Sequence, residues 1–341
     1  MYLAPLNYDR YFRKVFSDTT IAKSFLEDFL GVNIQSIEML KTEHNLTDDS
    51  RAVKFDFRCK IDDRFVIIDM QQWFKPDIVH RFYVYHCINT ALQLEKLPLK
   101  SLSFGDSPVK EKKIKDYSEV LPVITLIWLA DDNLNFTDDY VSYTMIPESA
   151  SNFIRDTMIW EKPVLTDIVR NRENVLNQLE NKSRSLDFLM ENKLIYAFQK
   201  NIVNNGRFTS YHKWFELAEK TRNRLNKKAE FLKYKDDQIL LKIMERISKE
   251  ALSADDFTYI DNYEEYLERV KRYELGISKE ARKEGMREGE KRKAFRTALK
   301  MIKKQASVKD IIELTELSEQ NVLQLQQLVE KHGDNALNYL D

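Results

Sequence analysis

The chain is poor in the residues that build disulfide-bonded or loop-rich proteins. It has two cysteines, seven glycines and seven prolines among 341 residues. Cys59 and Cys87 have neither CxxC spacing nor a nearby histidine pair, which argues against a thiolate zinc site and a disulfide framework. This cysteine usage fits a reducing cytoplasm, where we expect the protein to reside. Scarce glycine and proline, with 32% charged residues, favour a helix-rich soluble protein.

The sequence also lacks a long apolar run and an excess of charge of either sign. Its longest nearly apolar stretch, VLPVITLIWLA at 120–130, is shorter than the roughly 20 residues that cross a bilayer. The N-terminal residues contain no apolar signal-peptide region, so we expect no membrane partner. The net charge of −1 gives no global nucleic-acid signature, and any DNA-binding patch must therefore be local.

What the sequence does contain is an ordered series of helix and strand patterns in its first 150 residues. The patterns are a helix at 8–30 ended by Gly31, strands at 33–44, 51–61 and 64–71, a helix from about Asp77 to Lys96, and a strand at 120–130. The continuous apolar character of the later strands indicates burial on both faces. The order α, β, β, β, α, β therefore predicts an α/β core with a mixed sheet covered by helices.

Helical patterns dominate after residue 150 and divide the remaining chain by composition. We expect a core at 1–150, a helical extension at 151–275, a charged helix or linker at 276–304, and a small helical element at 305–341. Ser307 with Asp310 forms a capping-box pattern, and Ser318 is a plausible N-cap for a second helix. Two short helices joined by a tight polar turn resemble a helix-turn-helix.

Two functions are consistent with the charged residues of the C-terminal part. Residues 271–304 contain 13 Lys and Arg against 5 Glu, at helical spacing such as Glu280, Glu284 and Glu288. A solvated helix with i, i+4 ion pairs is the favoured interpretation, and tracking along DNA is the alternative. The terminal helix pair either recognises DNA or packs and makes a homo-oligomer, and its second helix lacks a basic face.

Carboxylates and amides stand where hydrophobic strands end. Alternation puts Asp69 and Gln71 on one face of the strand at 64–71. In the preceding strand, Phe55 and Phe57 share one face, and Asp56 lies on the other. If the two strands form a hairpin, Asp56 and Asp69 lie side by side.

Two adjacent carboxylates repel each other unless a proton, a cationic side chain or a divalent metal intervenes. Oxygen ligands without histidine or cysteine favour Mg²⁺ or Mn²⁺, and such a cation activates water for attack on a phosphodiester. The alternative is that both acids are solvated strand ends beside a hairpin turn.

Several motifs in order resemble the PD-(D/E)XK nuclease family transposases, also called the Rpn or recombination-promoting nuclease family. The segments that carry the resemblance are YDRYFRKVF, SFLEDFLG, KFDFRCKIDDRFVIIDMQ, RFYVYH and YSEVLPVITLIWL. They cover about residues 5–150, with a weaker likeness through the tail. The resemblance implies a restriction-endonuclease-like core, a metal-dependent DNA endonuclease activity linked to recombination or to mobile or foreign DNA, and Mg²⁺ or Mn²⁺ as cofactor.

The resemblance also assigns roles to residues. Asp56 matches the first motif acid, Asp69 the second, and Gln71 the final position, with the main-chain carbonyl of Met70 as a further metal ligand. The second acid is more often Glu in this family, and Gln71 stands where most PD-(D/E)XK enzymes have Lys. A neutral amide cannot offset charge on the attacked phosphate. A DNA-binding or oligomerising protein with a weak or inactive nuclease site is therefore the competing hypothesis.

Five residues are expected to support the site. Asp9 matches the acid of the first helix, Arg13 stands where Lys is usual, and Glu27 is a further acid in reach of a metal. Each of the two acids is otherwise a surface charge. Arg81 and Tyr85 are four residues apart on one helix face, so that Arg81 contacts a phosphate or pairs with Asp69 while Tyr85 packs or stacks.

Overall fold

The computed structural model describes residues 1–44, 53–72, 77–102, 112–180, 186–304 and 306–332, with 271, 274–292, 330 and 332 described through their backbone alone. The chain forms two compact units, Met1–Ser253 and Ala254–Asp341. None of the helices within these described ranges has the length and apolar character needed to cross a membrane.

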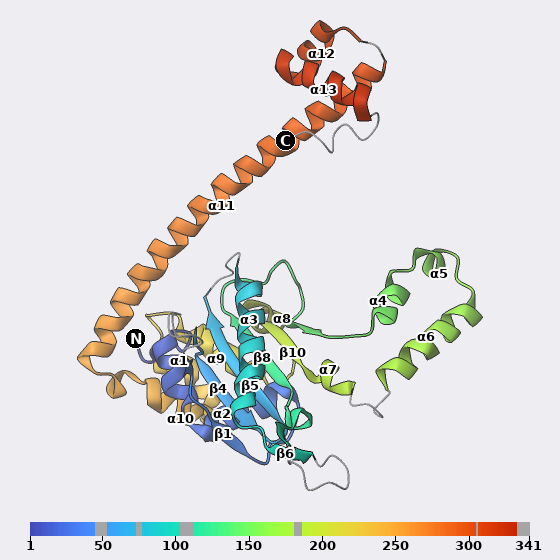
Figure 1. The fold of residues 1–341 in the computed structure, drawn as a ribbon. Coiled ribbons are helices and arrows are strands. Elements are labelled where there is room, and N and C mark those ends of the chain that lie inside the picture. Colours follow the sequence, from blue (N-terminus) through green and yellow to red (C-terminus); the bar gives the residue numbers. More distant parts are fainter. Residues whose placement is uncertain (45–52, 73–76, 103–111, 181–185, 305, 333–341) are drawn as a thin grey trace. The chain divides into compact units, whose positions relative to one another are not determined.

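A six-stranded mixed sheet in the order β1-β4-β5-β8-β10-β9 forms the centre of the first unit (Figure 1). β5, β8 and β10 run parallel to one another, whereas β1, β4 and β9 are antiparallel to their neighbours. The strands are β1 Ile37–Met39, β4 Phe57–Ile61, β5 Arg64–Gln71, β8 Val123–Leu129, β9 Tyr140–Thr144 and β10 Lys193–Phe198. Two small ladders join β2 Glu43–His44 to β3 Val53–Lys54 and β6 Leu99–Leu102 to β7 Lys112–Lys115. The mixed α/β architecture expected from the sequence is confirmed.

Helices cover both faces of this sheet, and β8 is accordingly buried at every position. On one face Trp128 packs against aromatic rings from α1 Asp9–Phe16, α2 Thr19–Leu30 and α9 His212–Thr221. On the other face Ile127 and Leu129 pack against α3 Ile78–Ala91, which continues as the 3₁₀ helix η1 Leu92–Glu95. The alternation of strand side chains thus divides the core into two layers.

The helical pattern at 8–30 forms two helices instead of one. Asp18 ends the first and caps the second, since its carboxylate accepts the N–H groups of Thr20 and Ile21 at 3.0 and 3.3 Å. The same carboxylate pairs with Lys242 and Arg246 of α10 Gln238–Ile247. Gly31 ends α2 in the left-handed region at φ +67°, as its position after the last helical residue predicts.

The strand expected at 51–61 is interrupted at Asp56, and this corrects the expected facing of two aromatic rings. Phe57 contacts Phe16 of α1, whereas Phe55 packs with Ile67 and Ile88 on the α3 side. The two rings therefore lie on opposite faces, because the bend at Asp56 breaks the two-residue alternation.

The sheet is completed by a strand from the region expected to be a helical extension. β10 lies between β8 and β9 and is buried from Ile195 to Phe198. Short, continuously apolar runs of this kind fit a buried strand as well as a buried helical turn, so periodicity alone did not reveal it. The helices of the region are α4 Glu148–Arg155, α5 Thr157–Glu161, α6 Leu165–Leu179, α7 Asp187–Glu191, α8 Gln199–Asn205, α9, η4 Lys228–Tyr234, α10 and η5 Lys249–Ala251.

The second unit consists of a long helix and two short ones. α12 Val308–Thr315 and α13 Glu319–His332 pack on the last turns of α11 Ala254–Lys303 through a small apolar cluster. Ser307 caps α12 by accepting the N–H of Asp310 at 3.2 Å, as predicted, and Ser318 accepts the N–H of Asn321 at 3.2 Å. The ion pairs expected between Glu280, Glu284 and Glu288 and the basic residues of the same helix involve side chains outside the described ones.

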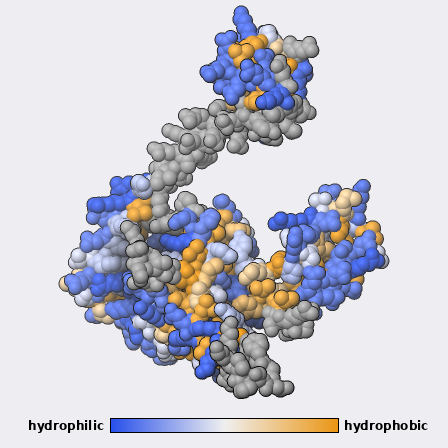
Figure 2. All heavy atoms as spheres, viewed as in Figure 1, coloured by the Kyte–Doolittle hydropathy of each residue, from blue (hydrophilic) through white to orange (hydrophobic). Residues whose placement is uncertain are grey.

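The outer face of α3 is unusually apolar. Figure 2 shows a hydrophobic strip in the region of this helix, and the side chains of Val79, Tyr83 and Val84 are exposed. The buried residues of α3 are mixed, since His86 and Asn89 lie among Ile78, Phe82 and Ile88.

Candidate functional site

The two carboxylates singled out in the sequence meet at the open end of a hairpin. The β4–β5 ladder ends with Phe57 opposite Ile68, and Asp56 precedes Phe57 while Asp69 follows Ile68. The two acids are close enough that the charge of Asp56 raises the pKa of Asp69.

Asp56 stands where β4 separates from β5. Phe55 turns away and donates its N–H to the carbonyl of Thr42 at 2.8 Å. The N–H of Met70 therefore has no strand partner on this side, and Asp56 Oδ2 accepts it at 2.9 Å. Because the N–H and C=O of a strand residue face the same neighbour, the Met70 carbonyl also faces the side of Asp56.

Asp69 is a buried carboxyl, 4% exposed. Burial and then the charge of Asp56 raise its pKa well above the ordinary value, against the opposing charge of Arg81. Gln71 donates its side-chain N–H to Asp69 Oδ1 at 2.5 Å and favours the ionised form. Asp69 therefore holds a proton at pH values where an ordinary aspartate is charged.

Asp56 forms an ion pair with an arginine of α1, the helix on the opposite face of the sheet from α3. Arg13 of α1 donates from Nη2 and Nε to Asp56 Oδ1 at 2.6 and 3.3 Å. The Asp56 side chain is 8% exposed and that of Arg13 is 33% exposed, so the pair lies at the protein surface on the arginine side. The chain thus supplies a cationic partner for Asp56, and the raised pKa of Asp69 favours its protonated form.

The donor atoms at this point fit a hard divalent cation. The two carboxylates, the Met70 carbonyl and the Gln71 amide present only oxygen as ligand, the chemistry that suits Mg²⁺ or Mn²⁺. No group of three or more His, Cys, Asp or Glu that would hold a metal occurs within the described ranges. A cation here would consequently keep several waters, which is usual for Mg²⁺.

The two candidates on α3 approach Asp69 from the other layer. Arg81 lies with its guanidinium carbon 4.7 Å from the ring centroid of Phe82, and its Nε is buried without a hydrogen-bond partner among the residues that the structure covers. Tyr85 packs edge-on against Phe55 and Phe82 at 5.3 and 5.6 Å between ring centroids. Burial, followed by the charge of Asp69, raises the pKa of Tyr85.

The two remaining acids have different positions. Asp9 begins α1, and its charge adds to the effects of burial and Asp56 on Asp69, which places it within electrostatic range of the site. Glu27 instead accepts the N–H of Ile34 at 3.0 Å and lies 3.9 Å from Lys23. Its carboxylate ties the end of α2 to the next loop, and it belongs to no metal-binding group among the described residues.

Asp131 is a polar residue beside the site that the sequence reading did not single out. It follows β8, donates its N–H to the carbonyl of Gln72 at 2.9 Å, and pairs with Arg222 and Lys200 at 2.6 and 2.8 Å. Burial would raise its pKa, but the hydrogen bonds from these two cations outweigh it and lower the value. Its position two residues past the end of a parallel strand is the sequence signal for it, because the ends of parallel strands share one sheet edge.

The candidate site is therefore an acidic pair at the end of β5, reached by α1 from one layer and α3 from the other. Comparisons with protein-family models, curated proteins and solved structures gave no match.

Proposed function

We propose that this protein is a metal-dependent DNA endonuclease with a PD-(D/E)XK core, acting in recombination or on mobile or foreign DNA. The observation that supports the proposal is the closeness of Asp56 to Asp69, with Asp56 hydrogen-bonded to the main chain of Met70. The succession of helix, three-stranded antiparallel unit, helix and parallel strand β8 is also the order expected of this core. Burial and the charge of Asp56 disfavour the ionised form of Asp69. A divalent cation bound between the two acids would offset both charges and take the place of the proton on Asp69.

The proposed reaction is hydrolysis of a phosphodiester bond. A bound Mg²⁺ or Mn²⁺ would lower the pKa of a water molecule and offset charge on the phosphate. Asp56, Asp69 and the Met70 carbonyl would hold the cation, while the Gln71 amide fixes Asp69 through Oδ1.

A positive side chain for the phosphate must come from a residue other than Gln71. Arg13 is the better placed of the two nearby arginines, since its side chain is partly exposed whereas Arg81 lies against Phe82. A guanidinium that pairs with Asp56 in the resting protein is close enough to contact a phosphate bound beside that carboxylate.

Plasmid nicking with Mg²⁺ or Mn²⁺ tests this function. Asp56→Asn and Asp69→Asn should each lower the nicking rate at least about 100-fold, because each removes an anionic ligand of the cation. Asp63→Asn is the matched control, since Asp63 lies at the other end of the same hairpin with a side chain 65% exposed. It should leave the rate within about twofold of the wild type, as surface substitutions usually do.

Two outcomes of this assay contradict the proposal. One is nicking that persists in both purified site variants. The other is the absence of nicking with every divalent metal tried, at protein concentrations where DNA binding is saturated.

A second function is supported by the Arg13–Asp56 pair itself. An ion pair at 2.6 Å already neutralises one of the two acids. Asp69 stands where the family more often has Glu, and Gln71 stands where most PD-(D/E)XK enzymes have Lys, although Gln is common in this family. These features favour a DNA-binding or oligomerising protein that keeps the nuclease fold with weak or no cleavage. DNA binding that does not depend on divalent metal, combined with no nicking, would identify this function.

A further inference from the structure

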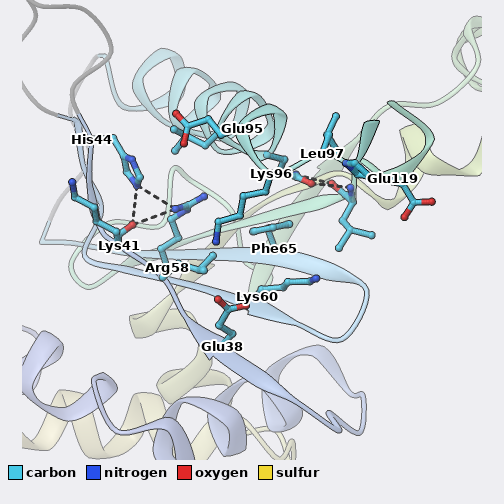
Figure 3. A pocket seen from close by; sticks show the side chains of 15 residues that line it. Glu38, Lys41, His44, Arg58, Lys60, Phe65, Glu95, Lys96, Leu97 and Glu119 are labelled. Carbon is cyan, nitrogen blue, oxygen red and sulfur yellow. Dashed lines mark hydrogen bonds between the residues drawn. The ribbon is translucent and has the colours of Figure 1, made fainter. Parts of the chain in front are cut away.

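A separate pocket of about 350 Å³ lies on the α3 side of the sheet, near the start of β5 (Figure 3). Its floor is formed by β1, β4 and β5, and its rim by η1 and the residues that follow it. The apolar cluster of Phe55, Ile67 and Ile88 lies on the same face, between this pocket and the acidic pair along β5. The volume is within the range of about 300–1,000 Å³ that is usual for small-molecule sites.

Arg58 is the central group of the pocket. It is 6% exposed, and its Nε donates to Asn89 Oδ1 at 2.5 Å. Its Nη1 contacts the carbonyl of Lys41 at 3.3 Å and the His44 ring at 3.2 Å, so three neighbours fix the guanidinium.

Among the described residues the charge of Glu95 acts on this buried guanidinium, but without forming an ion pair. Within the described ranges Arg58 forms no ion pair, and its Nη2 has no hydrogen-bond partner. Burial of a charge without a counter-charge is costly, and the cost is offset when an anion binds. Nη2 is not among the buried polar atoms without partners, which agrees with its facing the pocket.

Lysines, three glutamates (Glu38, Glu95 and Glu119) and apolar side chains line the rest of the pocket. Lys41, Lys60 and Lys96 line the pocket, and Figure 3 shows Lys96 extending from the rim toward the sheet on the side of Arg58. In the same view the carboxylates of Glu95 and Glu119 extend away from the guanidinium. The apolar part of the wall comes from Leu40, Phe65, Leu92, Leu97 and Leu121.

We propose that this pocket binds a small organic phosphate monoester. The phosphate lies between Arg58 and Lys96, and the apolar body of the ligand rests against Leu40, Leu92 and Phe65. Two cations match the double charge of a monoester, whereas a phosphodiester carries one charge and needs an exit for a second substituent. The site is independent of the acidic pair and of the proposed nuclease activity.

Calorimetric titration of the full chain with phenyl phosphate in EDTA tests the proposal. EDTA is present because a cation at the acidic pair would itself bind phosphate. We expect saturable binding to one site, weakened at least about tenfold by Arg58→Gln and by Lys96→Gln, since each removes a charge-assisted contact. Lys113→Gln is the matched control, an exposed lysine of β7 outside the pocket, and it should change the affinity by less than about twofold.

Lys96→Gln is the decisive variant if Arg58→Gln fails to fold, because Lys96 is exposed. The proposal is overturned if phenyl phosphate shows no saturable binding up to about 10 mM, a range weaker than ordinary specific ligands. It is also overturned if Lys96→Gln and Lys113→Gln act equally, or if methyl phenyl phosphate, a diester with the same ring, binds as tightly. Retained phenyl phosphate binding in Asp69→Asn separates this site from the nuclease proposal.

Discussion

At the scale of single residues, Asp69 is a carboxyl whose surroundings disfavour its charge. Since its pKa is raised in the folded chain, folding takes up a proton between the ordinary and the raised pKa. Its contribution to stability is therefore complete below the ordinary pKa and is lost as the pH rises through the raised one. Asn imitates the protonated carboxyl and can still accept the hydrogen bond from Gln71.

We expect Asp69→Asn to raise the free energy of unfolding at pH 8 by about 1–3 kcal/mol without metal, the range for a buried polar group left uncompensated. The difference from the wild type should shrink toward about pH 4, near the ordinary pKa of aspartate. Urea unfolding at several pH values measures it. A variant less stable than the wild type at pH 8 would show that Asp69 is not a destabilised charge.

Arg13 and a divalent cation compete for the same carboxylate. We therefore expect Arg13→Gln to bind Mn²⁺ more tightly than the wild type, by about three- to tenfold, and yet to nick DNA more slowly. Calorimetry and the plasmid assay give the two quantities. Arg10→Gln, an exposed arginine of the same helix, is the control. Weaker Mn²⁺ binding in Arg13→Gln would mean that Arg13 supports the cation site instead of competing with it.

At the scale of elements, local sequence signals predicted most of the first 130 residues because those signals are short-range. The hairpin of β4 and β5, the helix α3 and the strand β8 follow from apolar periodicity and the turn at Asp62 and Asp63. The break at Asp18 and the missing strand β10 did not follow. The first depends on a capping side chain bound by α10, and the second on burial between two other strands.

The two acids of the site could be predicted from local sequence, whereas their partners could not. The hairpin of β4 and β5 brings Asp56 and Asp69 near each other, since both acids adjoin its last residue pair, whereas the bend at Asp56 did not follow from strand alternation. The partners of these acids come from far along the chain: Arg13 is 43 residues from Asp56. The anchoring of Arg58 by Asn89, 31 residues away, is likewise a product of packing that periodicity does not encode.

The end of α2 offers a test of how far local geometry determines an element. Gly31 has φ +67°, and a Cβ there would meet no atom within 4 Å, so a substitution is strained only through the backbone. Gly31→Ala should lower the free energy of unfolding by about 1–2 kcal/mol, and Gly31→Asn by less. Urea unfolding measures both. Equal effects of the two variants would place the cost in side-chain contacts instead.

At the scale of the whole molecule, every residue of the acidic pair and its partners lies in the unit Met1–Ser253. The second unit has its own apolar cluster around Phe295, Ile311 and Leu325. A chain ended after Ser253 should therefore keep its nicking rate at saturating DNA within about threefold of the full chain, since the removed residues make no part of the site. A loss of more than about tenfold would show that the site is incomplete without the second unit.

The same truncated chain tests the basic segment at 271–304. If this segment tracks DNA, its removal weakens binding and reduces the salt dependence of the affinity. Fluorescence anisotropy with a labelled duplex at several salt concentrations measures both. Unchanged affinity and salt dependence would favour a solvated helix stabilised by its own ion pairs.

If Asp56 and Asp69 together hold a divalent cation, anomalous diffraction from crystals soaked in Mn²⁺ at pH 8 will locate it. We expect one strong peak in contact with both carboxylates and the Met70 carbonyl, absent from Asp69→Asn crystals. No peak at this position, with Arg13 still paired to Asp56, would show that the two acids do not form a metal site.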